Sequence, residues 1–225
     1  MSFRTLVPRP IRDRLHPISR RIRRPALERT LRDIRQRGPQ ELPTIHQARQ
    51  LCVKWATGAT VSEDVLIEVA RLCRDADGPV LECGSGATTF IAAIYAKHGC
   101  WSLENDAPYR DLVVDTMNRA GLASHVVYAP LQPHEGFVWY DTSDAGLPER
   151  FAAVICDGPA GAALGGRFGL LPCMHESIAG AEVLLDDADR EGEQAVLRRW
   201  EELYGVSQIT RAGRAALLRV PVLGA

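Results

Sequence analysis

Short apolar runs alternate with amphipathic segments over most of this 225-residue chain. The apolar runs predict strands at residues 79–83, 100–106, 125–130, 151–159, 181–187, 206–210 and 215–222. The segments between them predict helices at about 60–75, 90–99, 108–120 and 188–205. Near-continuous apolar strands separated by helices are typical of a parallel sheet covered on both faces. We therefore predict an α/β fold with a Rossmann-like, doubly wound sheet whose ligand crevice lies at the carboxyl ends of the strands.

Two local patterns refine these boundaries. Thr60 and Glu63 have the spacing of a capping box, which predicts a helix beginning at about Thr60. Residues 131–149 are polar and aromatic without a clear period, and we expect a long loop there. Its aromatic residues Phe137, Trp139 and Tyr140 are candidates for a wall beside a ligand.

The first 40 residues differ in charge from the rest. They carry twelve arginines against three acidic residues, a net charge of +9, whereas the whole chain has a formal charge of −1. Their prolines predict short broken pieces, followed by a helix from Pro25 that ends at Gly38. We expect a basic helical extension over residues 1–59 and the main domain over 60–225. The arginines suit an anionic partner, a lid, a dimer contact or simple docking on the acidic domain, and the sequence leaves these alternatives open.

Composition narrows the class of protein. The chain is 46% hydrophobic and 24% charged, which is ordinary for a globular domain and excludes collagen, coiled coil and wholesale disorder. No apolar run is long enough to predict a transmembrane helix, and the N-terminus lacks the apolar region of a secretory signal. The six cysteines form no CxxC pair and favour free thiols. We expect a cytoplasmic protein, and homodimer formation stays open.

A glycine turn follows the first predicted strand. Gly84 and Gly86 allow a tight turn that a ligand can approach closely, and Glu104 ends the next strand. An acid at that position accepts hydrogen bonds from ribose hydroxyls, so the pair predicts a nucleoside site. The third glycine of a dinucleotide turn is absent, with Thr89 in its place, and Glu82 precedes the turn. A carboxylate there suits a positively charged ligand better than a pyrophosphate.

These motifs, VLECGSGATT (80–89) and SLEND (102–106), resemble those of class I S-adenosylmethionine-dependent methyltransferases. The resemblance covers residues 60–220 and implies a seven-stranded, mostly parallel sheet with its last strand inserted antiparallel. It implies S-adenosyl-L-methionine as cofactor, with Glu82, Gly84 and Gly86 along its methionine part and Glu104 at its ribose. The full set of cofactor residues that we expect is Glu82, Gly84, Ser85, Gly86, Thr88, Glu104, Asn105 and Asp157.

Carboxylates end two later strands. Asp157 follows the fourth strand, and Asp186 and Asp187 end the fifth. Neighbouring parallel strands lie about 5 Å apart, so the three groups should converge. They suit either a general base or a divalent cation such as Mg²⁺. We therefore consider Asp157 and Asp187 as catalytic residues, and Asp157, Asp186 and Asp187 as metal ligands; simple helix and turn capping is the alternative.

The surrounding sequence resembles one methyltransferase subgroup, which has DGP-G after the fourth strand, R-x-x-x-LP, and LDDA-R after the fifth. Here Asp157 opens the first of these motifs and Arg167 the second. Arg167 could pair with an anionic group of the substrate or lie at the surface. Catechol-type O-methyltransferases have metal-binding acids after the same strands, but this chain lacks their DAD-like motif, which leaves metal dependence open.

The function predicted from these features is methyl transfer to a hydroxyl of a small molecule or sugar. His134 in the loop is a further candidate base. No NPPY-type motif follows the fourth strand, which argues against methylation of the exocyclic amines of nucleobases, and we expect a small-molecule or sugar acceptor rather than nucleic acid. N-methylation, an NAD-type oxidoreductase and a non-catalytic scaffold that binds an anionic partner through the arginines remain as alternatives.

Overall fold

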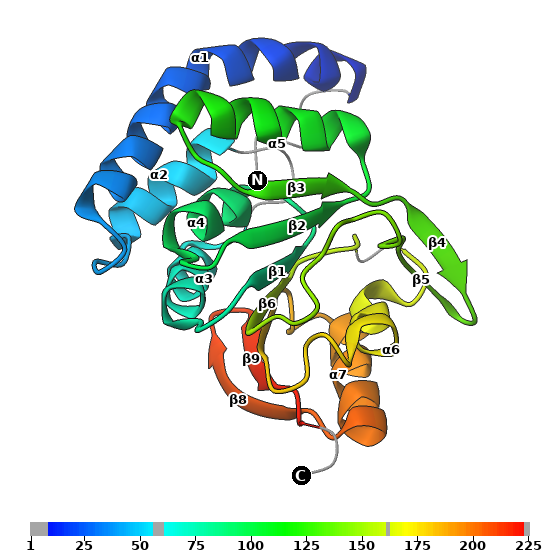
Figure 1. Cartoon of the computed structure of the whole chain (residues 1–225). Coiled ribbons are helices and arrows are strands. Elements are labelled where there is room, and N and C mark those ends of the chain that lie inside the picture. The colour runs from blue at the N-terminus through cyan, green and yellow to red at the C-terminus, as the bar shows by residue number, and fades with distance from the viewer. Residues whose placement is uncertain (1–8, 56–60, 161–162, 223–225) are drawn as a thin grey trace.

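The computed structural model describes residues 9–55, 61–160 and 163–222, and the side chains from residue 23 onward. Its main feature is a seven-stranded sheet in the order β3-β2-β1-β6-β7-β9-β8 (Figure 1). The strands are β1 (Val80–Cys83), β2 (Cys100–Glu104), β3 (His125–Tyr128), β6 (Ala153–Cys156), β7 (Glu182–Leu185), β8 (Ser207–Ala212) and β9 (Ala215–Arg219). The predicted α/β fold and all seven predicted strands are confirmed.

The strand directions also agree with the prediction. Strands β3, β2, β1, β6 and β7 are parallel to one another. Strand β9, the last in sequence, lies between β7 and β8 and is antiparallel to both. The chain runs outward from β1 to β3 and then returns to β6 on the other side of β1. The connections that leave the carboxyl ends of β1 and β6 therefore run to opposite sides, which opens a crevice above these ends.

Helices cover both faces of the sheet. Helices α3 (Glu63–Asp75), α4 (Ala87–Tyr95) and α5 (Ala107–Ala120) pack on one face, and α6 (Leu170–Met174) and α7 (Glu191–Tyr204) on the other. Helix α3 begins after its N-cap residue, Ser62, which is later than predicted. Thr60, where we expected the helix to begin, lies outside the described residues. None of the helices in the described part of the chain has the length and apolar character needed to span a bilayer.

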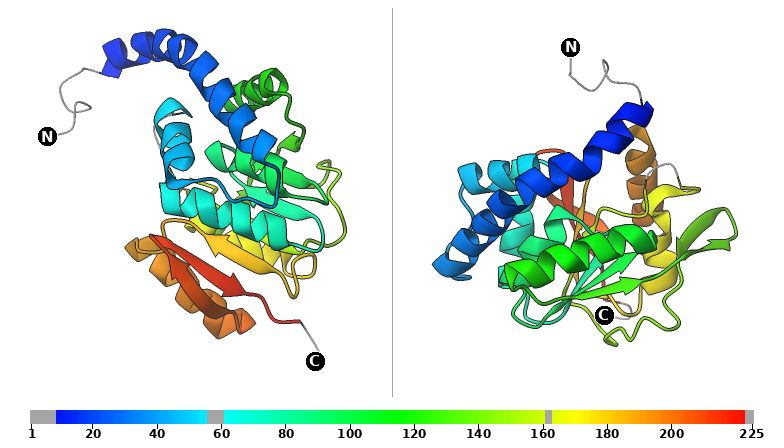
Figure 2. Two further views of the ribbon diagram at one scale, coloured as in Figure 1. Left: turned by 90° about the vertical axis from the view of Figure 1, so that its left-hand side faces the viewer. Right: turned by 90° about the horizontal axis from the view of Figure 1, so that it is seen from above.

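The N-terminal region forms helices α1 (Arg9–Arg37) and α2 (Ile45–Trp55). The prediction of short pieces broken by proline is wrong, because α1 continues through Pro25. The exposed position of Pro25 keeps its ring away from the core, while Leu27 and Leu31 are buried two and six residues later. The buried side chains of α1 and α2 belong to the same hydrophobic cluster as those of α3, α4 and α5. Figure 2 shows α1 crossing the molecule above α5 and α2.

The predicted loop at 131–149 contains a hairpin instead. Strands β4 (Leu131–His134) and β5 (Phe137–Tyr140) pair antiparallel around a two-residue turn at Glu135 and Gly136. Gly136 has a φ of 79°, which glycine adopts without strain. The run FVWY followed a glycine and had high strand propensity. We missed the hairpin because its first strand, Leu-Gln-Pro-His, is polar and largely exposed.

Candidate active site

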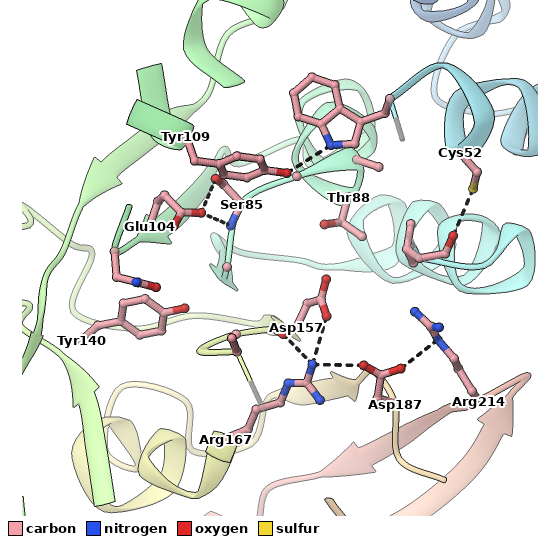
Figure 3. Close-up of a pocket in the computed structure, with 18 of the residues that line it drawn as sticks. Cys52, Ser85, Thr88, Glu104, Tyr109, Tyr140, Asp157, Arg167, Asp187 and Arg214 are labelled. Atoms are coloured by element: carbon pink, nitrogen blue, oxygen red, sulfur yellow. Dashed lines mark hydrogen bonds and ion pairs between the residues drawn. The ribbon is translucent and has the colours of Figure 1, made fainter. Parts of the chain in front are cut away.

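A cavity of about 370 Å³ lies at the carboxyl ends of β1, β2, β6 and β7. It occupies the crevice that the strand order predicts, and Figure 3 shows its main side chains. Predicted site residues on its wall are Gly84, Ser85, Gly86, Thr88, Glu104, Asn105, Asp157 and Asp187. The wall also includes Cys52, Trp55, Val61, Ala87, Tyr109, Tyr140, Gly158, Ala160, Arg167, Arg190 and Arg214.

The glycine turn forms one side of the cavity. Gly84 has a φ of 88°, and a Cβ atom added to it would lie 2.9 Å from the backbone nitrogen of Gly158. Any larger residue would push β1 and β6 apart at the point where the crevice opens. The next glycine, Gly86, precedes helix α4, and its N–H donates to Oγ1 of Thr89 at 2.8 Å. The turn therefore exposes backbone to the cavity, as the sequence predicted.

Glu104 ends β2 and holds this turn. Its Oε2 atom accepts hydrogen bonds from the N–H of Ser85 at 3.1 Å and from the Ser85 hydroxyl at 2.7 Å. Its Oε1 atom accepts from the N–H of Asp106 at 2.9 Å. The carboxylate is thus fixed at the cavity wall, where it can accept hydrogen bonds from ligand hydroxyls.

Glu82 does not line the cavity, contrary to our expectation. It shares its face of β1 with Val80, and its side chain is fully buried beneath the turn. Its Oε2 atom accepts hydrogen bonds from the hydroxyls of Ser102 and Thr89. Thr89 in turn accepts the N–H of Gly86. Glu82 therefore supports the glycine turn from below.

The stability of the protein should fall as the pH rises through the pKa of Glu82. Burial raises this pKa from 4.5 to about 7. The folded state then holds a proton that the unfolded state releases at lower pH, so raising the pH favours unfolding. The shift predicts that the unfolding free energy falls by about 3 kcal/mol from this group alone. Urea unfolding of the wild type and Glu82→Gln at a series of pH values measures it; parallel pH profiles for the two proteins would contradict the assignment.

Asp157, Asp186 and Asp187 lie close together, as predicted, and Asp157 and Asp187 line the cavity. One oxygen from each carboxylate lies within 4.8 Å of the others. Asp186 and Asp187 are buried, whereas the Asp157 side chain is 37% exposed and faces the cavity. Asp187 has a φ of 55°, in the left-handed region. This backbone turn follows β7 directly.

Three arginines pair with these acids. Arg167 is 2% exposed and donates to Asp157 Oδ1 at 3.0 Å, with Asp187 Oδ2 at 3.5 Å. Arg214 donates to both oxygens of Asp186 at 3.0 and 2.9 Å, and its Nε lies 3.2 Å from Asp187 Oδ1. Arg190 approaches Asp187 Oδ2 at 2.7 Å. Five of the six carboxylate oxygens are therefore occupied by guanidinium groups.

Arg167 is the centre of this network. Its guanidinium also donates to the carbonyl oxygens of Asp157 and Asp186 and pairs with the buried Glu193 at 3.0 Å. Arg167 thus connects the ends of β6 and β7 to the first turn of α7. The surface alternative for Arg167 is wrong, because its side chain is buried; it lines the cavity, and its partners in the structure are protein groups.

The pairing of these acids with arginines also determines whether they can hold a metal ion. A divalent cation needs several carboxylate oxygens directed at one point. Here Asp186 and Asp187 already direct both of their oxygens at arginines, and three positive guanidinium groups surround the position. These residues therefore do not fit a divalent cation without the displacement of the arginines.

Asp157 keeps one oxygen for the cavity. Among the described residues, its Oδ2 atom has no hydrogen-bond or ion-pair partner. Partial loss of hydration at the cavity wall and the neighbouring charge of Asp186 raise the pKa of Asp157 to about 6, while Arg167 opposes this shift. A carboxylate with this pKa is ionised at neutral pH and can accept a proton.

The remaining candidates come from the segment 131–149, and most of them lie away from the cavity. His134 is on the exposed hairpin, stacks on Phe137 and does not line the cavity. Of the three aromatic candidates in this segment, only Tyr140 reaches the cavity wall. We did not predict Trp55 and Tyr109, which join through an Nε1–H···Oη hydrogen bond of 3.3 Å beside Gly86. Nothing local in the sequence indicated that α2 reaches this site.

The sequence matches no family model and no curated protein. Its structure is similar to solved methyltransferase structures. A methyltransferase-like protein from Silicibacter pomeroyi has a TM-score of 0.54 and 21% identity, over 74% of this chain and 90% of that one. An O-methyltransferase from Bacillus cereus, in complex with S-adenosylhomocysteine, has a TM-score of 0.52 and 15% identity, over 79% and 92%.

RNA methyltransferases are also among the similar structures. A 16S rRNA methyltransferase from Thermus thermophilus, in complex with S-adenosylmethionine and guanosine, has a TM-score of 0.52 and 17% identity. The similarity covers 75% of this chain and 45% of that protein. These similarities establish that the chain has the methyltransferase type of Rossmann-like fold.

Proposed function

We propose that this protein is an S-adenosylmethionine-dependent methyltransferase that methylates a hydroxyl group of a small molecule or sugar. The observation that carries the proposal is the single open oxygen of Asp157, opposite Glu104 across one cavity. The fold of the similar structures supports it, and two of those proteins were solved with S-adenosylmethionine or its product. Their different substrates do not fix the acceptor of this chain.

The cavity residues fit this cofactor. Glu104 can accept hydrogen bonds from the two ribose hydroxyls, and Ser85, Asn105 and the N-terminus of α4 surround the same space. The glycines at 84 and 86 leave room for a ligand against the backbone. When bound, S-adenosylmethionine supplies a methyl group on a positively charged sulfur.

Asp157 supplies the remaining chemistry. Its Oδ2 atom would accept the proton of the acceptor hydroxyl, whose oxygen would take the methyl group that the bound cofactor would supply, with the electron pair of the broken carbon–sulfur bond left on sulfur. Arg167 fixes the other oxygen of Asp157, so the direction of the open lone pair is set before the acceptor binds. We propose that this reaction needs no divalent cation, since arginines hold the neighbouring acids.

Glu104→Ala should weaken the binding of S-adenosylhomocysteine by more than tenfold. The change removes two charge-assisted hydrogen bonds to ribose, each of about 1.5–3 kcal/mol. Calorimetric titration of the wild type and the variant measures the effect. Glu135→Ala, in the exposed hairpin turn, is a matched control that should bind normally.

Two outcomes of this titration would count against the proposal. Equal affinity of Glu104→Ala and the wild type would refute the ribose site. If the wild type bound NADH but not S-adenosylhomocysteine, the protein would belong with the oxidoreductases.

A further inference from the structure

Helix α1 concentrates positive charge at one edge of an acidic protein. Seven arginines and a single acidic residue lie between positions 9 and 24. The first 40 residues have a net charge of +9 and the whole chain −1, so the rest of the chain carries −10. Docking on this acidic remainder does not use every arginine of α1. Arg24 pairs with Asp115, whereas Arg29 and Arg32 are exposed and have no ion-pair partner among the described residues.

The same arginine-rich stretch has a regular apolar pattern. Helix α1 is continuous from Arg9 to Arg37. At 3.6 residues per turn, its aliphatic positions before Pro25 fall in one narrow stripe, and the arginines fall around the rest of the circumference. The stripe consists of Ile11, Leu15, Ile18 and Ile22. The N-terminal half of α1 is therefore a basic amphipathic helix.

The stripe lies on a different side of α1 from the residues that pack on the main domain. Those packed residues are Leu27, Leu31 and Ile34, which are all buried. At about 100° per residue, their positions lie about 140° around the helix axis from the stripe. Arg29, seven residues after Ile22, continues the line of the stripe and is exposed. In the left view of Figure 2, the N-terminal part of α1 (dark blue) reaches past the other helices. Packing within the chain thus gives no reason for the stripe.

An anionic bilayer accounts for the charge and the stripe together. Nucleic acids also attract arginines, but their phosphates are bound by cationic and polar groups, which leaves a row of aliphatic positions without a role. A helix that lies in a membrane interface needs both features. Its apolar side enters the boundary between headgroups and acyl chains, and its basic residues meet the lipid phosphates.

We propose that the N-terminal half of α1, residues 9–24, binds the surface of membranes that contain anionic phospholipids. The apolar stripe supplies the positions that enter the interface. The rest of the chain, with its net charge of −10, is repelled by the same surface, which confines the contact to α1. This inference concerns where the protein acts, and it does not depend on the proposed methyl transfer.

Flotation of the full chain with lipid vesicles tests the proposal. The vesicles are made of phosphatidylcholine, with or without phosphatidylglycerol. We expect the wild type to bind the anionic vesicles at least about tenfold more tightly than the neutral ones, because several arginines approach the charged surface. Added salt should weaken the binding. Equal binding to both kinds of vesicle, or binding to neither, would overturn the proposal.

Two double variants separate the apolar stripe from the charge. Leu15→Ser with Ile18→Ser removes half of the stripe and keeps every arginine, and we expect it to weaken binding to anionic vesicles about tenfold or more. The matched control is His16→Gln with Ser19→Ala, which changes the same turn outside the stripe and should bind like the wild type. Wild-type binding by the serine variant would refute the interfacial helix.

Two further measurements make the outcomes distinct. Both double variants should melt at the wild-type temperature, because the described buried residues of α1 begin at Leu27. Hydrogen exchange should show that anionic vesicles protect the amides of residues 9–24, whereas protection confined to other segments would overturn the proposal. The RNA polyuridylate serves as the other polyanion. A wild type that binds this RNA but not the anionic vesicles would assign α1 to nucleic acid instead.

Discussion

Arg167→Met should lower the unfolding free energy by about 3–5 kcal/mol, the range for removal of one partner from a buried ion pair. The guanidinium lies between the carboxylates of Asp157, Asp187 and Glu193 and is 2% exposed. Methionine fills a similar volume but leaves these acids without a central cation. They must then either stay ionised at a cost or take up protons. Denaturant unfolding measures the loss, which should grow as the pH rises.

Arg190→Met is the matched control for this prediction. Arg190 pairs with the same Asp187, but its side chain is 58% exposed. Exposed ion pairs contribute about 0–1 kcal/mol, so this variant should unfold almost like the wild type. Arg167→Lys keeps the charge but cannot reach all of the acceptors, and we expect an intermediate loss. Equal stability of Arg167→Met and Arg190→Met would show that the buried network does not hold the ends of β6 and β7 together.

The sheet was predictable because its signal is local. Each buried strand appears as an apolar run of a few residues, and each intervening helix has its own period. The glycine turn was equally local, since Gly84 and Gly86 lie between a strand and a helix. The hairpin of β4 and β5 was missed because Gln132 and Pro133 interrupt the pattern of a buried strand. Its function as a wall of the cavity depends on a single residue, Tyr140.

The arginine network could not be predicted, because its members come from distant parts of the chain. Arg214 precedes β9, which is inserted beside β7, so it reaches Asp186 from 28 residues away. Arg167 was expected to pair with the substrate or to lie at the surface, and it is instead buried at the centre of the network. The positions of the three acids at the ends of neighbouring strands correctly predicted that they lie close together. Their pairing with arginines depends on the directions of side chains from distant parts of the chain. Glu82 shows the same limit: its position was clear, whereas the face of β1 that it occupies was misjudged.

Asp157→Asn should lower methyl transfer by about 10²–10⁴-fold, the usual contribution of a general base. Asparagine preserves the size of the side chain but cannot accept the acceptor's proton. The neutral product S-adenosylhomocysteine should bind the variant as it binds the wild type, since Glu104 and the glycine turn are unchanged. The measurement is transfer from radiolabelled S-adenosylmethionine to a panel of small hydroxyl compounds and sugars. An active compound then allows the wild type and the variant to be compared.

The pH dependence of the wild-type rate and the effect of a chelator are measured in the same assay. Its rate should rise with pH through the Asp157 pKa of about 6, because the ionised carboxylate is the active form. A chelator should leave the rate unchanged, since Arg167, Arg190 and Arg214 occupy the positions from which a cation would be held. Loss of activity with a chelator, restored by Mg²⁺, would assign these acids to a metal. Normal turnover by Asp157→Asn would exclude Asp157 both as the general base and as a metal ligand. Positioning of the acceptor would then be the main source of catalysis.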